Sequence, residues 1–124
     1  MSLFRWIRGN MLPGQIDPGE VLFKGEHAGG KTENEIKDLW IAIFAQYPEV
    51  QSAFLARVVY GAEITEHISL CVACPKNRKR VLTALQAPFQ TLFRDDQHVD
   101  IRFLDDREEE SVRRVCRPFF EAKR

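Results

Sequence analysis

One segment of this sequence has the residue types and spacing of a phosphate-binding loop. Gly25-Glu26-His27-Ala28-Gly29-Gly30-Lys31-Thr32 fits the pattern G-x-x-x-x-G-K-[S/T], between an expected strand and an expected helix. In such a loop, backbone N–H groups surround the phosphates, Lys31 would reach the β- and γ-phosphates, and Thr32 would hold Mg²⁺. The competing interpretation is that Gly29 and Gly30 only turn the chain and that Thr32 caps the helix.

We favour the second interpretation, because nucleotide-binding loops of this kind belong to parallel sheets and this chain predicts a central antiparallel hairpin. Free N–H groups at a helix N-terminus still favour an anion, and Lys31 would add a positive charge. The candidates for a weak anion site are therefore Gly29, Gly30, Lys31 and Thr32.

The three cysteines predict buried thiols rather than a metal or redox centre. Cys71-Val72-Ala73-Cys74 forms a C-x-x-C motif at the end of an expected strand, where residues three apart point to opposite faces. Two such sulfur atoms cannot meet in a disulfide or on one metal ion. With Cys116 the cysteine count is odd, and no secretory signal is expected, so reduced thiols in a cytosol are predicted. We expect no metal and no cofactor.

The remaining polar side chains show no catalytic arrangement. His27, His67 and His98 lack the spacing of metal ligands and of a Ser-His-Asp triad. Clusters of like charge are typical of solvated loops and helix ends, and here they lie at residues 76 and 78–80, 95–96, 105–106 and 108–110. No catalytic residue is predicted, and the sequence favours a protein that is not an enzyme.

The clearest structural element is a helix that follows Thr32. Thr32 and Glu35 have the spacing of a capping box, and Pro48 ends the helix. The apolar stripe at helical spacing consists of Ile36, Leu39, Trp40, Ile43, Phe44 and Tyr47.

The other elements follow from the periodicity of apolar residues. Residues 21–23 predict a short strand, and residues 50–60, apolar on both faces, predict a central one. Residues 64–73 follow a short turn, which predicts a hairpin, and alternation over residues 98–103 predicts a half-buried strand. A second helix has the stripe Val81, Leu82, Leu85, Phe89 and Leu92 with a break at Pro88. A last helix from about Glu108 has the stripe Val112, Val115, Cys116 and Phe119.

This order predicts an α+β fold: a ferredoxin-like βαββαβ antiparallel sheet with helices on one face, plus a C-terminal helix. Residues 1–19, rich in glycine and proline, are predicted to be an irregular N-terminal arm, and residues 20–124 to form a single domain. The arm, the last helix or a second subunit would cover the other sheet face.

Composition excludes several classes of function. The formal net charge is zero over 124 residues, which removes the basic surplus typical of nucleic-acid binding. The βαββαβ order is shared by RNA-recognition modules, but the strand 67–72 has no aromatic residue on which bases could stack. No apolar run approaches the ~20 residues of a membrane span. We expect a cytoplasmic protein.

Several strings resemble the C-terminal domain of the SseB (enhanced serine sensitivity) protein family. They lie at residues 21–25, 39–44, 47–50, 53–57, 99–105 and 117–121, so the resemblance covers about residues 20–121. The last of them, Arg117-Pro118-Phe119-Phe120-Glu121, is similar to the Pro-Phe-Tyr ending of that family. The resemblance implies a fold and a bacterial origin, and no catalytic residues can be transferred from it.

Two hypotheses follow from the sequence. The first is a non-enzymatic interaction or regulatory domain of the SseB C-terminal type, with a protein partner or self-association and with no nucleic-acid partner. The alternative is a small nucleotide- or phosphate-binding protein that uses the segment Gly25–Thr32.

Overall fold

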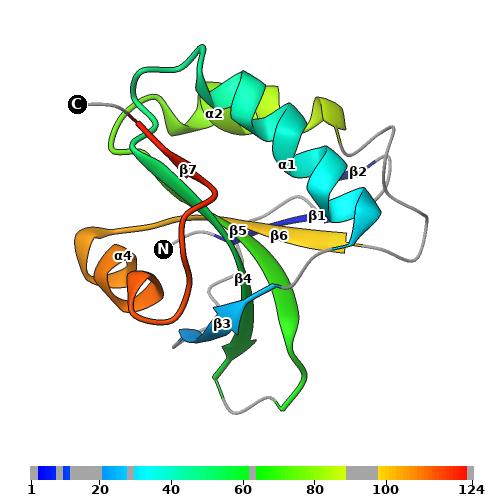
Figure 1. Cartoon of the computed structure of the whole chain (residues 1–124), viewed down its shortest axis with the longest axis vertical. Helices are drawn as coiled ribbons and strands as arrows, with labels where there is room; N and C mark the ends of the chain where they lie inside the picture. Colours follow the sequence, from blue (N-terminus) through cyan, green and yellow to red (C-terminus); the bar gives the residue numbers. More distant parts are fainter. Residues whose placement is uncertain are drawn as a thin grey trace.

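The computed structural model describes residues 3–7, 10–11, 21–27, 30–61, 64–88 and 98–122, and it shows an α+β architecture (Figure 1). The strands are β1 (Leu3–Ile7), β2 (Asn10–Met11), β3 (Val21–Glu26), β4 (Ser52–Tyr60), β5 (His67–Ala73), β6 (His98–Phe103) and β7 (Phe120–Glu121). The helices are α1 (Lys31–Phe44), α2 (Arg78–Leu85) and α4 (Asp106–Arg113). None of these helices is long and apolar enough to cross a membrane.

The strands form one mixed sheet. Its order is β2-β1-β6-β5-β4-β3, and β7 also pairs with β4. The pair β5–β6 is parallel, whereas the other pairs are antiparallel. The α+β class is confirmed, and so is the hairpin β4–β5, in which Val58 stands opposite His67.

The predicted ferredoxin-like strand order is wrong. That order would place β3 between β5 and β6. Instead, β6, which follows α2 in the chain, pairs directly with β5, and β3 lies at the sheet edge and pairs with β4. The alternation of side chains is the same in both arrangements, because it fixes the two faces of each strand and not the neighbour beside it. The sequence pattern therefore could not distinguish them.

Part of the segment predicted as an irregular arm is a strand. Within residues 1–19, β1 pairs antiparallel with β6, with Leu3 opposite Arg102 and Ile7 opposite His98. Residues 3–7 therefore extend the sheet sideways instead of lying across its face. The single domain over residues 20–124 stays a prediction.

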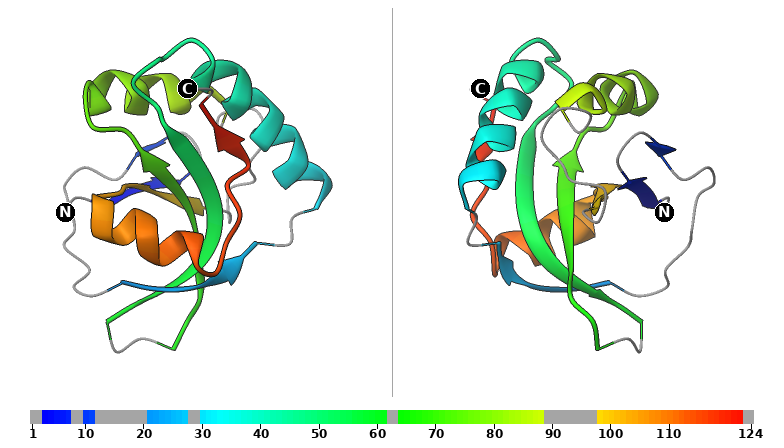
Figure 2. Two further views of the ribbon diagram at one scale, coloured as in Figure 1. Left: turned by 60° about the vertical axis from the view of Figure 1, so that its left-hand side comes forward. Right: turned by 90° about the vertical axis from the view of Figure 1, so that its right-hand side faces the viewer.

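Helices cover both faces of the sheet: α1 and α2 share one face, as expected, and α4, one of the three candidates expected to cover the other face, lies on it. Alternate residues of β4 point to opposite sides: Leu55 belongs to a core cluster with α1 and α2, and Phe54 to a second cluster with α4. We call these sides the α1–α2 face and the α4 face. Figures 1 and 2 show α1 and α2 side by side and α4 apart from them.

The buried stripes of the helices are largely as predicted, but the N-termini of α1 and α4 differ from the prediction. In α1, Ile36, Trp40 and Phe44 are buried, but the N-cap is Gly30 without a side-chain cap, so the Thr32 capping box is wrong. The capping box lies at α4 instead, where Asp105 accepts a hydrogen bond from the Glu108 N–H at 2.8 Å. That helix begins at Asp106, slightly earlier than expected.

The C-terminal part of the apolar stripe predicted for the last helix does not belong to α4. Val115 is exposed, and Phe119 lies beyond α4, where its ring packs 6.2 Å from those of Trp40 and Phe44. On the second helix, α2 ends at Leu85 ahead of Pro88, and the predicted positions Phe89 and Leu92 lie outside the described residues.

Candidate functional site

The beginning of the loop-like segment is part of the sheet. Gly25 stands opposite Arg57 at a β-bulge, and the N–H of His27 donates to the Leu55 carbonyl at 3.0 Å. Gly25 has φ of +154°, and a Cβ atom there would lie 2.8 Å from Arg57 Nη2. The positive φ at this bulge requires the glycine, whereas the Arg57 side chain could move aside.

A carboxylate lies at the start of α1, where an anion would bind. A Cβ atom on Gly30 would lie only 2.9 Å from Glu33 Oε2, and Glu33 Oε1 lies 3.6 Å from His27 Nε2. A negative side chain complements the positive end of the helix dipole and repels a second negative charge. Lys31 is exposed, whereas Gly29 and the Thr32 side chain lie outside the described residues. The anion site stays a prediction.

The thiols are free and buried. Cys71 lies in the core cluster of the α4 face and Cys74 in that of the α1–α2 face, so the two sulfur atoms of the C-x-x-C point apart. Burial raises the pKa of Cys71 from 9.0 to about 12, and that of Cys116 to about 11. A neutral thiol is neither a good nucleophile nor a metal ligand. Within the described ranges, no group of His, Cys, Asp and Glu could hold a metal ion.

Polar side chains on β6 are buried. The prediction of a half-buried strand over residues 98–103 missed this, because it placed the polar residues on an exposed face. Asp100 accepts a hydrogen bond from the Tyr60 hydroxyl at 2.6 Å. Arg102 pairs with Glu108 of α4, with Nη2 at 2.5 Å and Nε at 2.7 Å from Glu108 Oε2. The Arg102 side chain is 6% exposed, so this ion pair lies between α4 and the sheet and holds the helix against that face.

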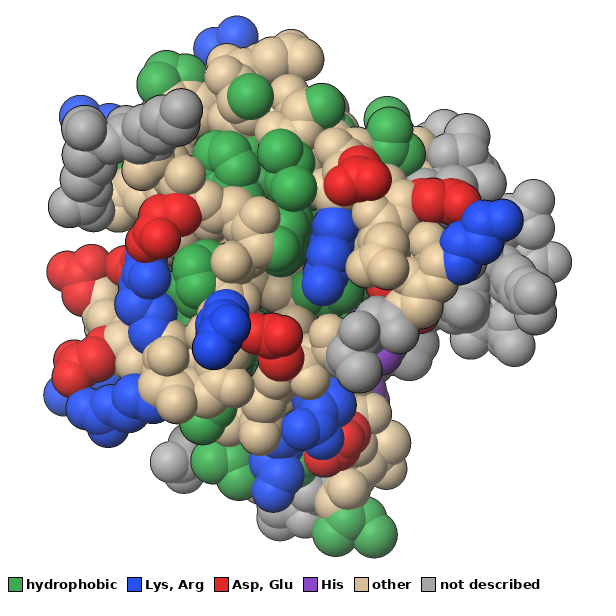
Figure 3. Space-filling model, viewed as in Figure 1, with side chains coloured by type: hydrophobic (Ala, Val, Ile, Leu, Met, Phe, Trp, Pro, Cys, Tyr) green, Lys and Arg blue, Asp and Glu red, His purple; other side chains and the backbone are tan. Residues whose placement is uncertain are grey.

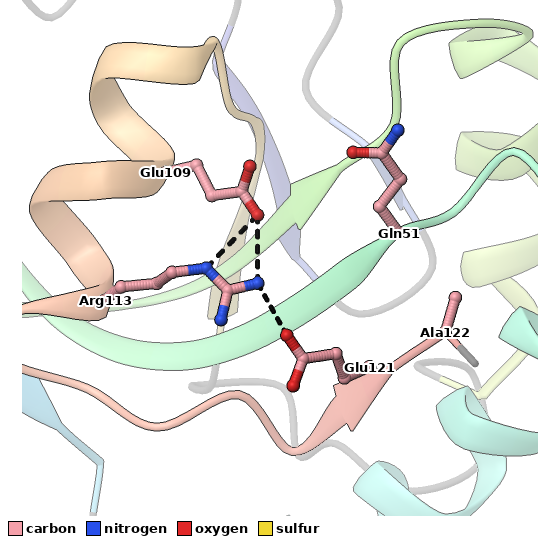
Figure 4. Close-up of a pocket in the computed structure, with 5 residues that line it drawn as sticks. All are labelled: Gln51, Glu109, Arg113, Glu121 and Ala122. Carbon is pink, nitrogen blue, oxygen red and sulfur yellow. Dashed lines mark hydrogen bonds and ion pairs between the residues drawn. The ribbon is translucent and has the colours of Figure 1, made fainter. Parts of the chain in front are cut away.

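Described residues line an open hollow of about 640 Å³ between α4 and β7. Its lining consists of Gln51, Glu109, Arg113, Glu121 and Ala122 (Figure 4). Sequence analysis missed it, because β7 has only two residues and no alternating pattern could reveal it. In the space-filling view, acidic and basic side chains lie next to one another over this part of the molecule (Figure 3).

Arg113 is the centre of the hollow's charge arrangement. Its Nη2 donates to Glu109 Oε2 at 3.1 Å and to Glu121 Oε1 at 2.9 Å, and its guanidinium carbon lies 5.3 Å from the centre of the Phe54 ring. The hydroxyl of buried Ser52 donates to the same Glu109 oxygen at 2.9 Å. These contacts hold α4, β4 and β7 together.

The geometry defines an α+β fold with a polar hollow, in which Glu109 holds both the Ser52 hydroxyl and Arg113. Residues 30–122 match the family model of the SseB protein C-terminal domain. The chain therefore belongs to that family, as the resemblance in the sequence predicts. Comparisons with curated proteins and with solved structures found no significant match.

Proposed function

We propose that this chain is a non-enzymatic interaction domain that associates with a second copy of itself. The observation that carries the proposal is the exposed apolar end of the sheet. Leu22 on β3 is 58% exposed, and Ile64, in the connection between β4 and β5, is 95% exposed. β3 and this connection are neighbours, because Val21 stands opposite Tyr60 at the end of β4. The three thiols, in contrast, are buried.

Strand β3 supplies the surface for the second copy. Among the described strands it pairs only with β4, so its outer edge presents N–H and C=O groups to a partner strand. Two β3 strands pairing antiparallel across a two-fold axis would satisfy both edges at once. Lys24 and the bulge at Gly25 limit this pairing to residues 21–23, which favours a closed dimer over an open fibre.

Light scattering of the full chain tests self-association. We expect the mass to rise from 14.4 kDa towards twice that value as the protein concentration increases, and Leu22→Lys to keep the protein monomeric. Leu39→Lys is the matched control, because Leu39 is an exposed leucine on α1 with 43% exposure. A wild-type chain that stays monomeric at all concentrations would contradict the proposal, and so would equal effects of the two substitutions.

The alternative function, binding of a nucleotide or phosphate by the segment Gly25–Thr32, has less support. In nucleotide-binding folds with such a loop, the strand before the loop has parallel neighbours in the sheet. The only described neighbour of β3 is antiparallel. Glu33 also places a carboxylate beside Gly30. We expect no heat of binding when Mg·ATP or Mg·GTP is titrated into the protein by calorimetry. Binding that disappears in Lys31→Ala would instead favour the alternative.

A further inference from the structure

The hollow between α4 and β7 has unused hydrogen-bond acceptors. Glu109 accepts from Ser52 and Arg113 through Oε2, and Glu121 accepts from Arg113 through Oε1. Among the described residues, Glu109 Oε1, Glu121 Oε2 and the Gln51 side chain have no hydrogen-bond partner. Figure 4 shows the Gln51 amide and the two carboxylates arranged around one space.

The charge balance of the described lining residues is negative. Two carboxylates face one guanidinium, and this guanidinium is already held between them and stacked on Phe54. A group that enters the hollow therefore meets acceptors and a surplus negative charge, so it must donate hydrogen bonds and carry a positive charge. An anion would have to displace Arg113 from both glutamates.

The dimensions and position of the hollow indicate a side chain rather than a free metabolite. About 640 Å³ is ample for one guanidinium or ammonium group, but the lining is polar, whereas pockets for small molecules are mostly apolar. The rim is formed by an exposed helix and by the edge strand β7, a surface that a partner chain can approach.

We propose that the hollow between α4 and β7 binds an arginine or lysine side chain of a partner protein. This inference rests on the proposed function, because it names the class of partner that a second surface of the same interaction domain would recognise. The hollow is separate from β3, because β7 pairs with the N-terminal end of β4 and β3 pairs with its C-terminal part.

The experiment is a titration of the full chain with an acetylated, amidated tetra-arginine peptide, followed by ¹H–¹⁵N correlation spectra. We expect the largest shifts at the amides of Gln51, Glu109, Arg113, Glu121 and Ala122. Replacing Glu121 with glutamine is expected to weaken binding about two- to five-fold, the range of one partly exposed charge pair. A tetraglutamate peptide should cause no shifts at these amides.

Glu110→Gln is the matched control, since it removes one carboxylate charge, as Glu121→Gln does, but from the exposed side of α4. Glu110 is 69% exposed and pairs with Arg114, outside the hollow. Equal weakening by both substitutions would show binding by overall charge alone and would overturn the inference, as would shifts elsewhere or no binding. Light scattering without peptide tests self-association through β3 separately. Self-association can persist when the peptide fails to bind, and the peptide can bind when the chain stays monomeric, so the two proposals can fail independently.

Discussion

Replacing Trp40 with alanine is expected to lower the free energy of unfolding by about 3–5 kcal/mol. The Trp40 side chain is fully buried in the core of the α1–α2 face. Its ring also packs against Phe119, so it connects α1 to the segment that leads into β7. Truncation would remove the largest fully buried side chain among the residues whose burial is described, and would leave a cavity that the sheet behind it cannot fill. Urea denaturation followed by far-ultraviolet circular dichroism measures the change.

The neighbouring Leu39 is the control for Trp40, because it lies on the same helix and is 43% exposed. Leu39→Ala should cost less than about 1 kcal/mol. If Trp40→Ala does not fold, Trp40→Phe keeps an aromatic ring and should show a smaller loss that can be measured. Equal costs for Leu39→Ala and Trp40→Ala would contradict the packing described for α1.

Replacing Arg102 with alanine is expected to cost about 3 kcal/mol, because the substitution would empty a buried site and leave the half-buried Glu108 without its cation. The Glu108 side chain is 16% exposed and also completes the capping box of α4. Loss of Arg102 would therefore weaken both the fold of the helix and its contact with β6. The same denaturation experiment measures this cost.

Arg114→Ala is the control for the Arg102 pair. Arg114 forms an ion pair with Glu110 on the same helix at 2.8 Å, but its side chain is 72% exposed. Such a pair contributes less than about 0.5 kcal/mol. Exchanging both Arg102 and Glu108 for methionine and leucine should recover much of the loss, since Arg102 Nη1 has no hydrogen-bond partner among the described residues. A double variant as unstable as Arg102→Ala would contradict this account.

Sequence periodicity predicted the elements well where each one has a distinctive apolar pattern. The α1 stripe contains the buried Ile36, Trp40 and Phe44, and β4, apolar on both faces, has β5 on one side and both β3 and β7 on the other. The opposite orientation of Cys71 and Cys74 followed from strand alternation alone. The family also followed from short strings, because core and turn residues keep their order along the chain.

The candidate site could not be predicted in the same way. The hollow combines residue 51, one face of α4 and a strand of two residues, which are distant in the sequence. Glu109 belongs to a run of three glutamates, and in the sequence nothing distinguishes it from Glu110. Only the packing of α4 on the sheet turns Glu109 towards Ser52 and leaves Glu110 in solvent.

The amino-acid sequence by itself determined the helices and strands that have an apolar pattern of their own, which of their residues face a core, and that the thiols are buried and apart. These properties depend on local spacing, which the backbone geometry of a helix or a strand converts directly into faces. The tertiary structure decided the strand order, the inclusion of β1 in the sheet, the placement of α4 on the second face and the charges in the hollow. Backbone hydrogen bonds are alike for any pair of strands, so these choices depend on the packing of the whole chain.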